Sequence, residues 1–451
     1  MTRGDNLLQN NELILSGGTI IDPLNRRMFQ SDIYIEDGVI KKIAKNLAVK
    51  VHKTSSPAKG SKPESNIKEF DIKGKYVAPG FVDLHAHLRE PGREDEETIE
   101  TGSYAALSGG FTKVCCMPNT EPPIDNEGVV RFILQESARV NFASVLTVGA
   151  ATKGRKGEEI SEIGSLVKAG VVAVSDDGEP ISNPFVMRRV LEYTKAFDLP
   201  VMSHCEVKAL SEDGVMNEGI VSTRLGLRGI PDVSEAAMVY QHILLADYTK
   251  SRLHLAHISS KKSVEIIRWA KEKGIDITCE TCPHYFSLTD AFCSTFDTNY
   301  KVNPPLQTQA DVEAIRQGLS EGLIDAIATD HAPHLASEKE VEFDLAPFGM
   351  IGFQTAFALG YEELVVKKYL NMVDYIAKLT VEPAKILKLE PPTIEIDKKA
   401  NLVIFDTKIK WTFKRESIHS KSQNSPFIGK ELIGKVMLVI TGGRGFDFSK
   451  D

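Results

Sequence analysis

A repeated order of strand followed by helix is the feature of this sequence that most restricts its fold. Eight stretches of strand character follow one another between Lys75 and about Leu389, and helical stretches separate them. In the segment 263–274, for example, Val264, Ile267 and Ala270 recur at helical spacing. The eight strand stretches are 76–88, 111–119, 143–152, 169–177, 199–206, 252–259, 275–286 and 323–334. This order predicts a (β/α)8 barrel of the TIM type.

Reactive side chains of such a barrel lie at the carboxyl ends of its strands. The first stretch ends in an H-x-H pattern, and alternation along a strand predicts that Asp83, His85, His87 and Arg89 point the same way. Further imidazole, carboxylate and amide groups end the later stretches: Asn119, Asp176–Asp177, His204, His257 and Asp330. These residue types suit a divalent metal ion without any thiolate. The sequence therefore predicts a metal site at this end of the barrel.

Other histidines do not end a predicted strand. His242 lies in a helical stretch, His254 early in its strand and His419 near the C-terminus, and all three are interpreted as packing or surface residues. His254 precedes His257 by three positions, so strand alternation predicts that the two side chains lie on opposite faces.

Composition argues against several classes of protein. The net charge of −8 disfavours a general nucleic-acid binder or a membrane-surface protein. No targeting pattern is visible, and no stretch approaches the roughly 20 apolar residues of a membrane helix. Six cysteines, two of them adjacent, do not resemble a disulfide framework. Cys279-x-x-Cys282 is interpreted as reduced strand cysteines, with a zinc knuckle as the alternative, and a cytoplasmic protein is expected.

The two ends of the chain have a different character from the middle. Short strands with Gly-containing turns are predicted over 12–71 and again near the C-terminus. We expect a small β-sandwich domain built from residues 1–74 and 390–451, with the barrel over 75–389 inserted between them. The polar segment rich in Lys, Ser and Pro near residues 50–66 is expected to be a mobile surface loop, and its His52 receives no function.

A set of motifs in order along the chain carries a resemblance to a known family. HAHLREPG, MPNT, SDDG, SHCE, AHIS, NPPL, ATDHAPH and APFG occur between Phe81 and Gly349. With these motifs the chain resembles the dihydroorotases of the amidohydrolase superfamily, from about Gly17 to the C-terminus. Taken singly, H-x-H and T-D-H also occur in hydantoinases, allantoinases and other barrel amidohydrolases. The combination is what makes the resemblance specific.

The resemblance implies a centre of two metal ions, normally Zn²⁺. His85, His87 and Asp330 would hold one ion, and His204 and His257 the other. Many relatives bridge the ions with a carboxylated lysine of the fourth strand. Here that strand reads VVAVSDDG, which matches the subgroup bridged by an aspartate and aligns Asp177 with it; Asp176 is the close competitor.

The implied reaction is the reversible cyclisation of N-carbamoyl-L-aspartate to L-dihydroorotate, a step of pyrimidine synthesis. In the ring-opening direction the cations would lower the pKa of a shared water, and the resulting hydroxide would attack the ring amide. Asp330 would carry the proton to the leaving nitrogen.

The substrate-binding residues are also implied by the resemblance. Arg89, Asn119 and His334 would hold the substrate carboxylate beside His87, while Asn303 and the backbone of Phe348–Gly349 would hold the ring amides. From the residues alone, Arg89 could instead pair with Glu90 or Glu94, and Asn119 could form a turn. The polar loop 334–349 could close over the substrate. The family usually has Leu-Arg after NPP, whereas this chain has Leu306-Gln307.

Two other functions share most of these features. A hydantoinase or allantoinase would open a different cyclic amide, and the missing lysine and the Arg89, Asn119 and His334 set disfavour it. A catalytically silent homologue would serve as a partner of aspartate carbamoyltransferase, but such partners lack metal ligands that this chain retains. A homodimer is the default expectation, because symmetric pairs are the commonest assemblies. Association with a carbamoyltransferase is an open alternative, and no nucleic-acid or membrane partner is expected.

Overall fold

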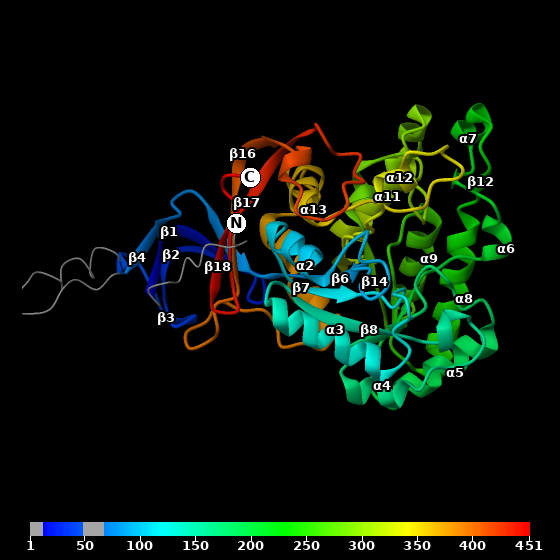
Figure 1. The fold of residues 1–451 in the computed structure, drawn as a ribbon, viewed down its shortest axis with the longest axis horizontal. Coiled ribbons are helices and arrows are strands. Elements are labelled where there is room, and N and C mark those ends of the chain that lie inside the picture. Colours follow the sequence, from blue (N-terminus) through cyan, green and yellow to red (C-terminus); the bar gives the residue numbers. More distant parts are fainter. Residues whose placement is uncertain (1–11, 48–66) are drawn as a thin grey trace, which may run out of the picture.

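The central part of the chain forms the predicted barrel. The computed structural model describes residues 12–47 and 67–451 (Figure 1). Eight parallel strands pair in the order β15-β14-β13-β10-β9-β8-β7-β6. Their bounds are β6 (Phe81–Ala86), β7 (Phe111–Cys116), β8 (Ser144–Ala150), β9 (Ala173–Ser175), β10 (Val201–Ser203), β13 (Leu253–Leu255), β14 (Ile277–Thr281) and β15 (Ala326–Ile327). A parallel bridge joins Ala86, at the end of β6, to His331, which follows β15 by four residues, so the predicted (β/α)8 fold is confirmed.

Helices follow the strands and cover the outside of the barrel. In α9 (Lys261–Glu272), Val264, Ile267 and Ala270 are buried as predicted, and Gly274 follows the helix with a φ of +72°. The other covering helices are α2 (Ile99–Ser108), α3 (Glu127–Val140), α4 (Ile163–Ala169), α5 (Pro184–Lys195), α8 (Val233–Thr249), α11 (Gln309–Ser320), α13 (Phe353–Gly360), α14 (Met372–Leu379) and α15 (Val381–Ile386). Their buried faces share one hydrophobic core with the barrel strands, except that Ile386 of α15 packs in a second cluster with strand residues such as Val82 and Ala326.

Shorter elements follow several strands at the carboxyl end of the barrel. After β10 come α6 (Lys208–Ser211), β11 (Met216–Asn217), α7 (Ile220–Leu225) and β12 (Gly229–Ile230). After β14 comes α10 (Pro283–Ser287), and after β15 comes α12 (Ala336–Lys339). The seventh predicted strand, 275–286, is thus wrong at its end, because Pro283 occupies the first turn of a helix there.

Both ends of the chain contribute to a second, mixed sheet beside the barrel (Figure 1). Its order is β18-β17-β16-β5-β1-β2-β3, and β4 also pairs with β1. The strands are β1 (Glu12–Asp22), β2 (Arg27–Glu36), β3 (Val39–Ala44), β4 (Lys68–Asp71), β5 (Tyr76–Pro79), β16 (Leu402–Thr412), β17 (Glu431–Thr441) and β18 (Arg444–Asp447). The predicted origin of the second domain in both ends is confirmed, whereas its boundaries at 74/75 and 389/390 stay predictions. The expected loop at 50–66, with His52, lies outside the described residues.

The first predicted strand is in fact two strands. Residues 76–79 form β5 of the mixed sheet, and β6 of the barrel begins at Phe81. Gly80 separates them, and a Cβ added there would lie 2.2 Å from Thr112 Oγ1 and 2.5 Å from Asn401 Oδ1. Asn401 comes from the C-terminal part of the chain and Thr112 from the barrel. Only glycine therefore fits where the two sheets meet.

Replacing Gly80 by alanine should destabilise the protein by about 1–3 kcal/mol, because the added methyl group overlaps these two side chains. The free energy of unfolding from urea denaturation measures the effect. Gly219→Ala is the matched control, since the nearest atom to its added Cβ is 3.9 Å away. Equal stability of the two variants would contradict this account of the junction.

Candidate active site

The six predicted metal ligands converge at the carboxyl end of the barrel. His85 lies in β6, and the others follow the ends of β6, β9, β10, β13 and β15. All six side chains are buried: His85, His87, Asp177, His204, His257 and Asp330. The predicted placement of these residues at the strand ends therefore brings them together in three dimensions.

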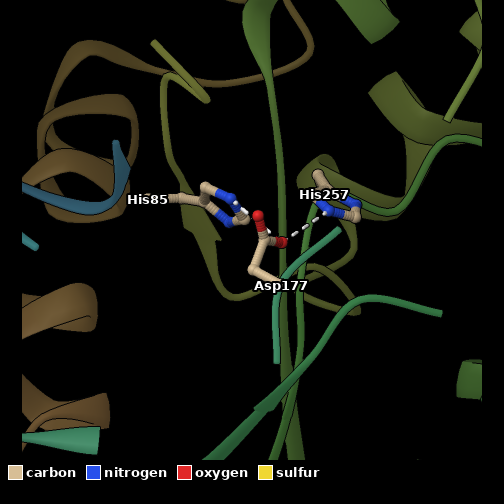
Figure 2. Close-up of side chains that lie close together, drawn as sticks. All are labelled: His85, Asp177 and His257. Carbon is tan, nitrogen blue, oxygen red and sulfur yellow. Dashed lines mark ion pairs between the residues drawn. The ribbon is translucent and has the colours of Figure 1, made fainter. Parts of the chain in front are cut away.

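Asp177 lies at the centre of this group. Its Oδ1 is 3.3 Å from His85 Nε2, 3.6 Å from His257 Nε2 and 3.8 Å from His204 Nδ1. Its Oδ2 is 3.6 Å from His87 Nε2. Figure 2 shows His85 and His257 approaching the carboxylate from different directions. One carboxylate thus contacts histidines from both of the pairs that the sequence distinguished.

Asp176, the competitor for this position, faces elsewhere. Its carboxylate accepts hydrogen bonds from the backbone N–H and the hydroxyl of Thr152. Burial raises the pKa of Asp176 to about 6, although the bonds from Thr152 oppose this rise. A group held in this way by Thr152 is less suited to bridge two cations than Asp177, which faces the imidazoles.

Asp330 lies beside the histidines at the carboxyl end of β6, His85 and His87. Its Oδ1 lies 3.1 Å from His87 Nε2 and 3.6 Å from His85 Nε2. The backbone of Asp330 is left-handed, with φ of 47°, and that of His257 has φ of 36°. Such angles are uncommon outside glycine and persist where surrounding contacts hold them. The barrel therefore places these two side chains at a cost in backbone energy.

Partners on the outer side of three rings determine which ring nitrogen faces the carboxylates. Asn119 Oδ1 lies 2.8 Å from His87 Nδ1, Glu206 Oε2 lies 3.0 Å from His204 Nε2, and Glu280 Oε1 lies 3.4 Å from His85 Nδ1. Because these oxygens can only accept, they favour a proton on the outer nitrogen. The inner nitrogen then carries a lone pair, as metal-binding histidines require.

Glu280 and His254 are functional candidates that sequence reasoning missed. Glu280 is fully buried in β14, between His85 and His254, with its Oε2 3.3 Å from His254 Nε2. The sequence indicates only a packing or surface role for His254, but the residue is buried, and Glu280 connects it to the predicted ligand His85. Strand alternation predicts which side chains of one strand share a face, but not which residues of different strands meet. His85, His254 and Glu280 lie in three different strands, so their contact is visible only in the folded barrel.

Asp83 has a role in the frame of the site. It is fully buried, and its carboxylate accepts hydrogen bonds from Thr329 N at 2.9 Å and from His85 N at 3.3 Å. It therefore ties the first barrel strand to the segment that ends in Asp330. The sequence pattern had grouped Asp83 with the histidines of its strand but gave it no role.

The charges of the two central carboxylates are stabilised by the rings. Burial alone would raise the pKa of Asp177, but His85 and His257 hold it well below its usual range. Burial likewise opposes ionisation of Asp330, and His87 and His85 lower its pKa. The reverse holds for His85, whose pKa burial would lower and Asp177 raises well above its usual range. The site thus retains two anionic carboxylates despite its burial.

The donor set fits divalent cations. Among the described residues, Nε2 of His85 and Oδ1 of Asp177 are buried and form no hydrogen bond of normal geometry, although they lie 3.3 Å apart. Buried polar atoms normally find partners, and a coordinated cation supplies one. The ligand atoms of His85, His87 and Asp330 lie within 4.8 Å of one another, as do those of His85, Asp177 and His257.

A cavity of about 920 Å³ opens above the cluster. It is large enough for a small cyclic substrate, since such pockets typically measure about 300–1,000 Å³. All the predicted substrate-binding residues line it: His87, Arg89, Asn119, Asn303, His334, Phe348 and Gly349. The cavity thus adjoins both the candidate metal ligands and the predicted carboxylate pocket.

Arg89 and His334 share one acidic partner. Arg89 Nε lies 2.9 Å from Glu96 Oε2, and His334 Nδ1 lies 3.0 Å from Glu96 Oε1. The Arg89 guanidinium also approaches His334 Nε2 at 3.3 Å and donates to Pro333 O at 3.1 Å. The expected alternative partners of Arg89, Glu90 and Glu94, are replaced by Glu96. This arrangement fixes a guanidinium and an imidazole side by side at the cavity wall.

The predicted contacts to the ring amides are already engaged within the protein. Asn303 Nδ2 donates to Glu206 Oε2 at 3.1 Å, and Gly349 N donates to Lys301 O at 2.8 Å. Phe348 O lies 2.8 Å from His334 Nε2. A substrate amide would therefore share or displace these hydrogen bonds.

Two further sequence features lie outside the described cavity lining. Gln307 is buried and donates weakly to Ser259 Oγ at 3.4 Å, so its departure from the usual arginine is an interior change rather than one in the cavity. All six cysteines are free and buried, as the interpretation of Cys279 and Cys282 requires.

Within 12–47 and 67–451, no helix is both long enough and apolar enough to span a membrane.

Sequence comparison identifies close relatives along nearly the whole chain. A family model described as dihydro-orotase-like matches residues 74–263. A dihydroorotase of Endomicrobium trichonymphae is 51% identical over 425 residues, which cover 94% of this chain and 96% of the relative. A dihydroorotase of Acetivibrio thermocellus is 46% identical and covers 96% and 98% of the two chains.

Structural comparison finds the same architecture at low sequence identity. An L-hydantoinase from Arthrobacter aurescens superposes with a TM-score of 0.82 at 21% identity, covering 97% of this chain and 96% of the other. A dihydropyrimidinase from Brevibacillus agri has a TM-score of 0.79 at 19% identity, covering 98% and 96%. These likenesses support the fold, and the identities to the sequence relatives decide the family. The chain belongs to the dihydroorotase family of cyclic amidohydrolases.

Proposed function

We propose that this chain catalyses the reversible cyclisation of N-carbamoyl-L-aspartate to L-dihydroorotate at the cluster around Asp177. The main observation behind this proposal is that two groups of residues, the cluster around Asp177 and the Arg89–His334 pair, lie at one cavity. Asp177 contacts four imidazoles at distances of 3.3–3.8 Å, and the Arg89–His334 pair lines the same cavity. The first group suits hydrolytic metal chemistry, and the second suits a substrate that carries a carboxylate.

Two divalent cations, Zn²⁺ by the family's usual chemistry, are the proposed cofactors. His85, His87 and Asp330 would hold one ion and His204 and His257 the other, with Asp177 between them. Bound there, the cations would supply Lewis acidity and lower the pKa of a coordinated water. Nε2 of His85 and Oδ1 of Asp177, which are buried and form no hydrogen bond, support this assignment.

The residues of the chain itself have four proposed tasks. Asp330 accepts the proton of the attacking water and gives it to the ring nitrogen as the ring amide C–N bond breaks. Arg89 and His334 hold the substrate carboxylate, and Asn119 supports this grip while it orients His87. Asn303 and the Phe348–Gly349 backbone face the ring amides. The reverse sequence of the same transfers closes the ring.

A hydantoinase-like or allantoinase-like reaction is the alternative. The solved neighbours named hydantoinase and dihydropyrimidinase share the fold but are only 21% and 19% identical, so they carry no argument about substrate. The fourth strand of this chain ends in Asp176–Asp177 without a lysine. A catalytically silent partner is disfavoured by the full set of predicted ligands.

Three further predictions concern assembly and location: homodimerisation, association with aspartate carbamoyltransferase and a cytoplasmic location. The six free cysteines support the last of these.

Purified protein loaded with zinc should decrease the ultraviolet absorbance of L-dihydroorotate and lose this activity with a chelator. Hydantoin and allantoin serve as parallel substrates. Asp330→Ala should lower turnover by about 10²–10⁴-fold, because it removes the proposed acid–base group. Ring opening of another cyclic amide alone would overturn the substrate. Substantial activity of Asp330→Ala would remove the proton-transfer role of Asp330.

Asp177→Asn should lose tightly bound zinc, because an amide lacks the charge that compensates two cations. Asp176→Asn is the matched control: its pKa of about 6 and its bonds from Thr152 make a neutral amide a tolerable substitute. Elemental analysis after dialysis measures zinc per chain. Zinc loss in Asp176→Asn, with full retention in Asp177→Asn, would assign the bridging position to Asp176.

Arg89→Met should raise KM for L-dihydroorotate by about 10- to 100-fold while zinc content stays unchanged, because charge-assisted hydrogen bonds contribute about 1.5–3 kcal/mol. Steady-state kinetics and elemental analysis measure both. Arg131→Met provides a control, since Arg131 is an exposed residue of α3 that pairs with Glu127. An unchanged KM in Arg89→Met would mean that another group holds the carboxylate.

A further inference from the structure

A short segment from the C-terminal part of the chain contacts the loops that form the proposed carboxylate pocket. This segment, Ser420–Ser425, lies in the connection between β16 and β17, and we call it the C-terminal strap. Four of its side chains are buried: Ser420, Ser422, Asn424 and Ser425. Buried polar side chains in a connecting segment require partners, and those of Ser420, Ser422 and Asn424 belong to the barrel.

The first half of the strap holds the loop that follows β6. The hydroxyl of Ser420 and the backbone N–H of Lys421 both donate to the carboxylate of Glu97, the latter at 3.1 Å. Ser422 Oγ donates to Glu96 O at 2.7 Å. Glu97 is fully buried, so the strap supplies donors to a charge that water cannot reach. Glu96 is thereby fixed through its backbone, while its side chain contacts the pocket.

The second half of the strap holds the loop that follows β15. Asn424 Oδ1 accepts from His334 N at 3.0 Å, and Asn424 Nδ2 donates to Ala332 O at 2.9 Å and to Gly349 O at 3.2 Å. The backbone O of Asn424 accepts from Ile351 N at 2.9 Å. One buried amide therefore links both ends of the loop 334–349 to each other.

These contacts meet at the pair Arg89 and His334. Glu96, held by Ser422, is the common partner of Arg89 Nε and His334 Nδ1. His334 itself is held from the other side, at its backbone, by Asn424. The strap thus anchors both walls between which the guanidinium and the imidazole lie.

We propose that the C-terminal strap sets the geometry of the carboxylate pocket and that Asn424 is a positioning residue acting through His334 and Gly349. This inference rests on the proposed dihydroorotase function, because it assumes that Arg89 and His334 bind the substrate carboxylate. A grip by two side chains loses affinity when either is displaced by a fraction of an ångström. The metal cluster, on strand ends that the strap does not contact through these bonds, should not depend on it.

Asn424→Ala should raise KM for L-dihydroorotate by about 10- to 100-fold, with kcat within about threefold of the unmodified protein and zinc content unchanged. The substitution removes all three hydrogen bonds of the amide. Gln423→Ala is the matched control, because the neighbouring Gln423 side chain is exposed and contacts Arg415 at 3.4 Å. Its kinetic constants should not change.

The split between KM and kcat distinguishes positioning from a general structural role. A KM within twofold of the unmodified protein, or a loss of zinc together with kcat, would overturn the proposal. Turnover by the unmodified protein is measured alongside, so failure of the proposed function is recognised separately from failure of the strap. If Asn424→Ala does not fold, Ser422→Ala tests the other anchor, with a several-fold rise in KM expected and an unchanged KM refuting the proposal.

Discussion

A carboxylate buried among four imidazoles is the interaction on which the rest of this structure depends. Asp177 is almost inaccessible to water, and its ionised form persists because His85 and His257 lie against it. Burying such charges is costly unless each is paired or coordinated. Behind the rings, Asn119, Glu206 and Glu280 contact the outer ring nitrogens and so provide the imidazoles with polar partners as well. The carboxyl end of the barrel is therefore a polar network enclosed by a hydrophobic core.

The second domain contributes to this network as well as to the stability of the fold. The mixed sheet packs on the barrel core through residues such as Phe405, whose ring lies 4.5 Å from that of Phe357. In the connection that follows β16, Asn424 accepts a hydrogen bond from the backbone N–H of His334. One part of the chain thus provides both apolar packing beside the barrel and polar anchoring at its open end. This coupling explains how residues more than 300 positions apart can share one pocket.

Much of the site could be predicted from the sequence because the barrel imposes a simple rule. Reactive residues lie at the carboxyl ends of strands: His85 is one of the last two residues of β6, and His204, His257 and Asp330 follow the ends of theirs. The choice between Asp176 and Asp177 could not be made in this way, since adjacent residues differ only in the direction of their side chains. In the structure Asp176 accepts hydrogen bonds from Thr152, whereas Asp177 faces the histidines, which favours Asp177 for this position. Likewise, the division of one predicted strand at Gly80 depends on side chains from two distant segments.

The sequence by itself determined the barrel and the residue types at its catalytic end, because the order of strands and helices can be recognised from local periodicity. It also determined the resemblance to a family, because the motifs occur in a fixed order along the chain. Only the tertiary structure decided which partners orient those residues. Glu280 and His254 lie on neighbouring strands, and Glu96 and Ser422 are 326 positions apart in the sequence. Hydrogen bonds between distant segments follow from how the chain closes on itself. No spacing within a single strand or helix encodes them.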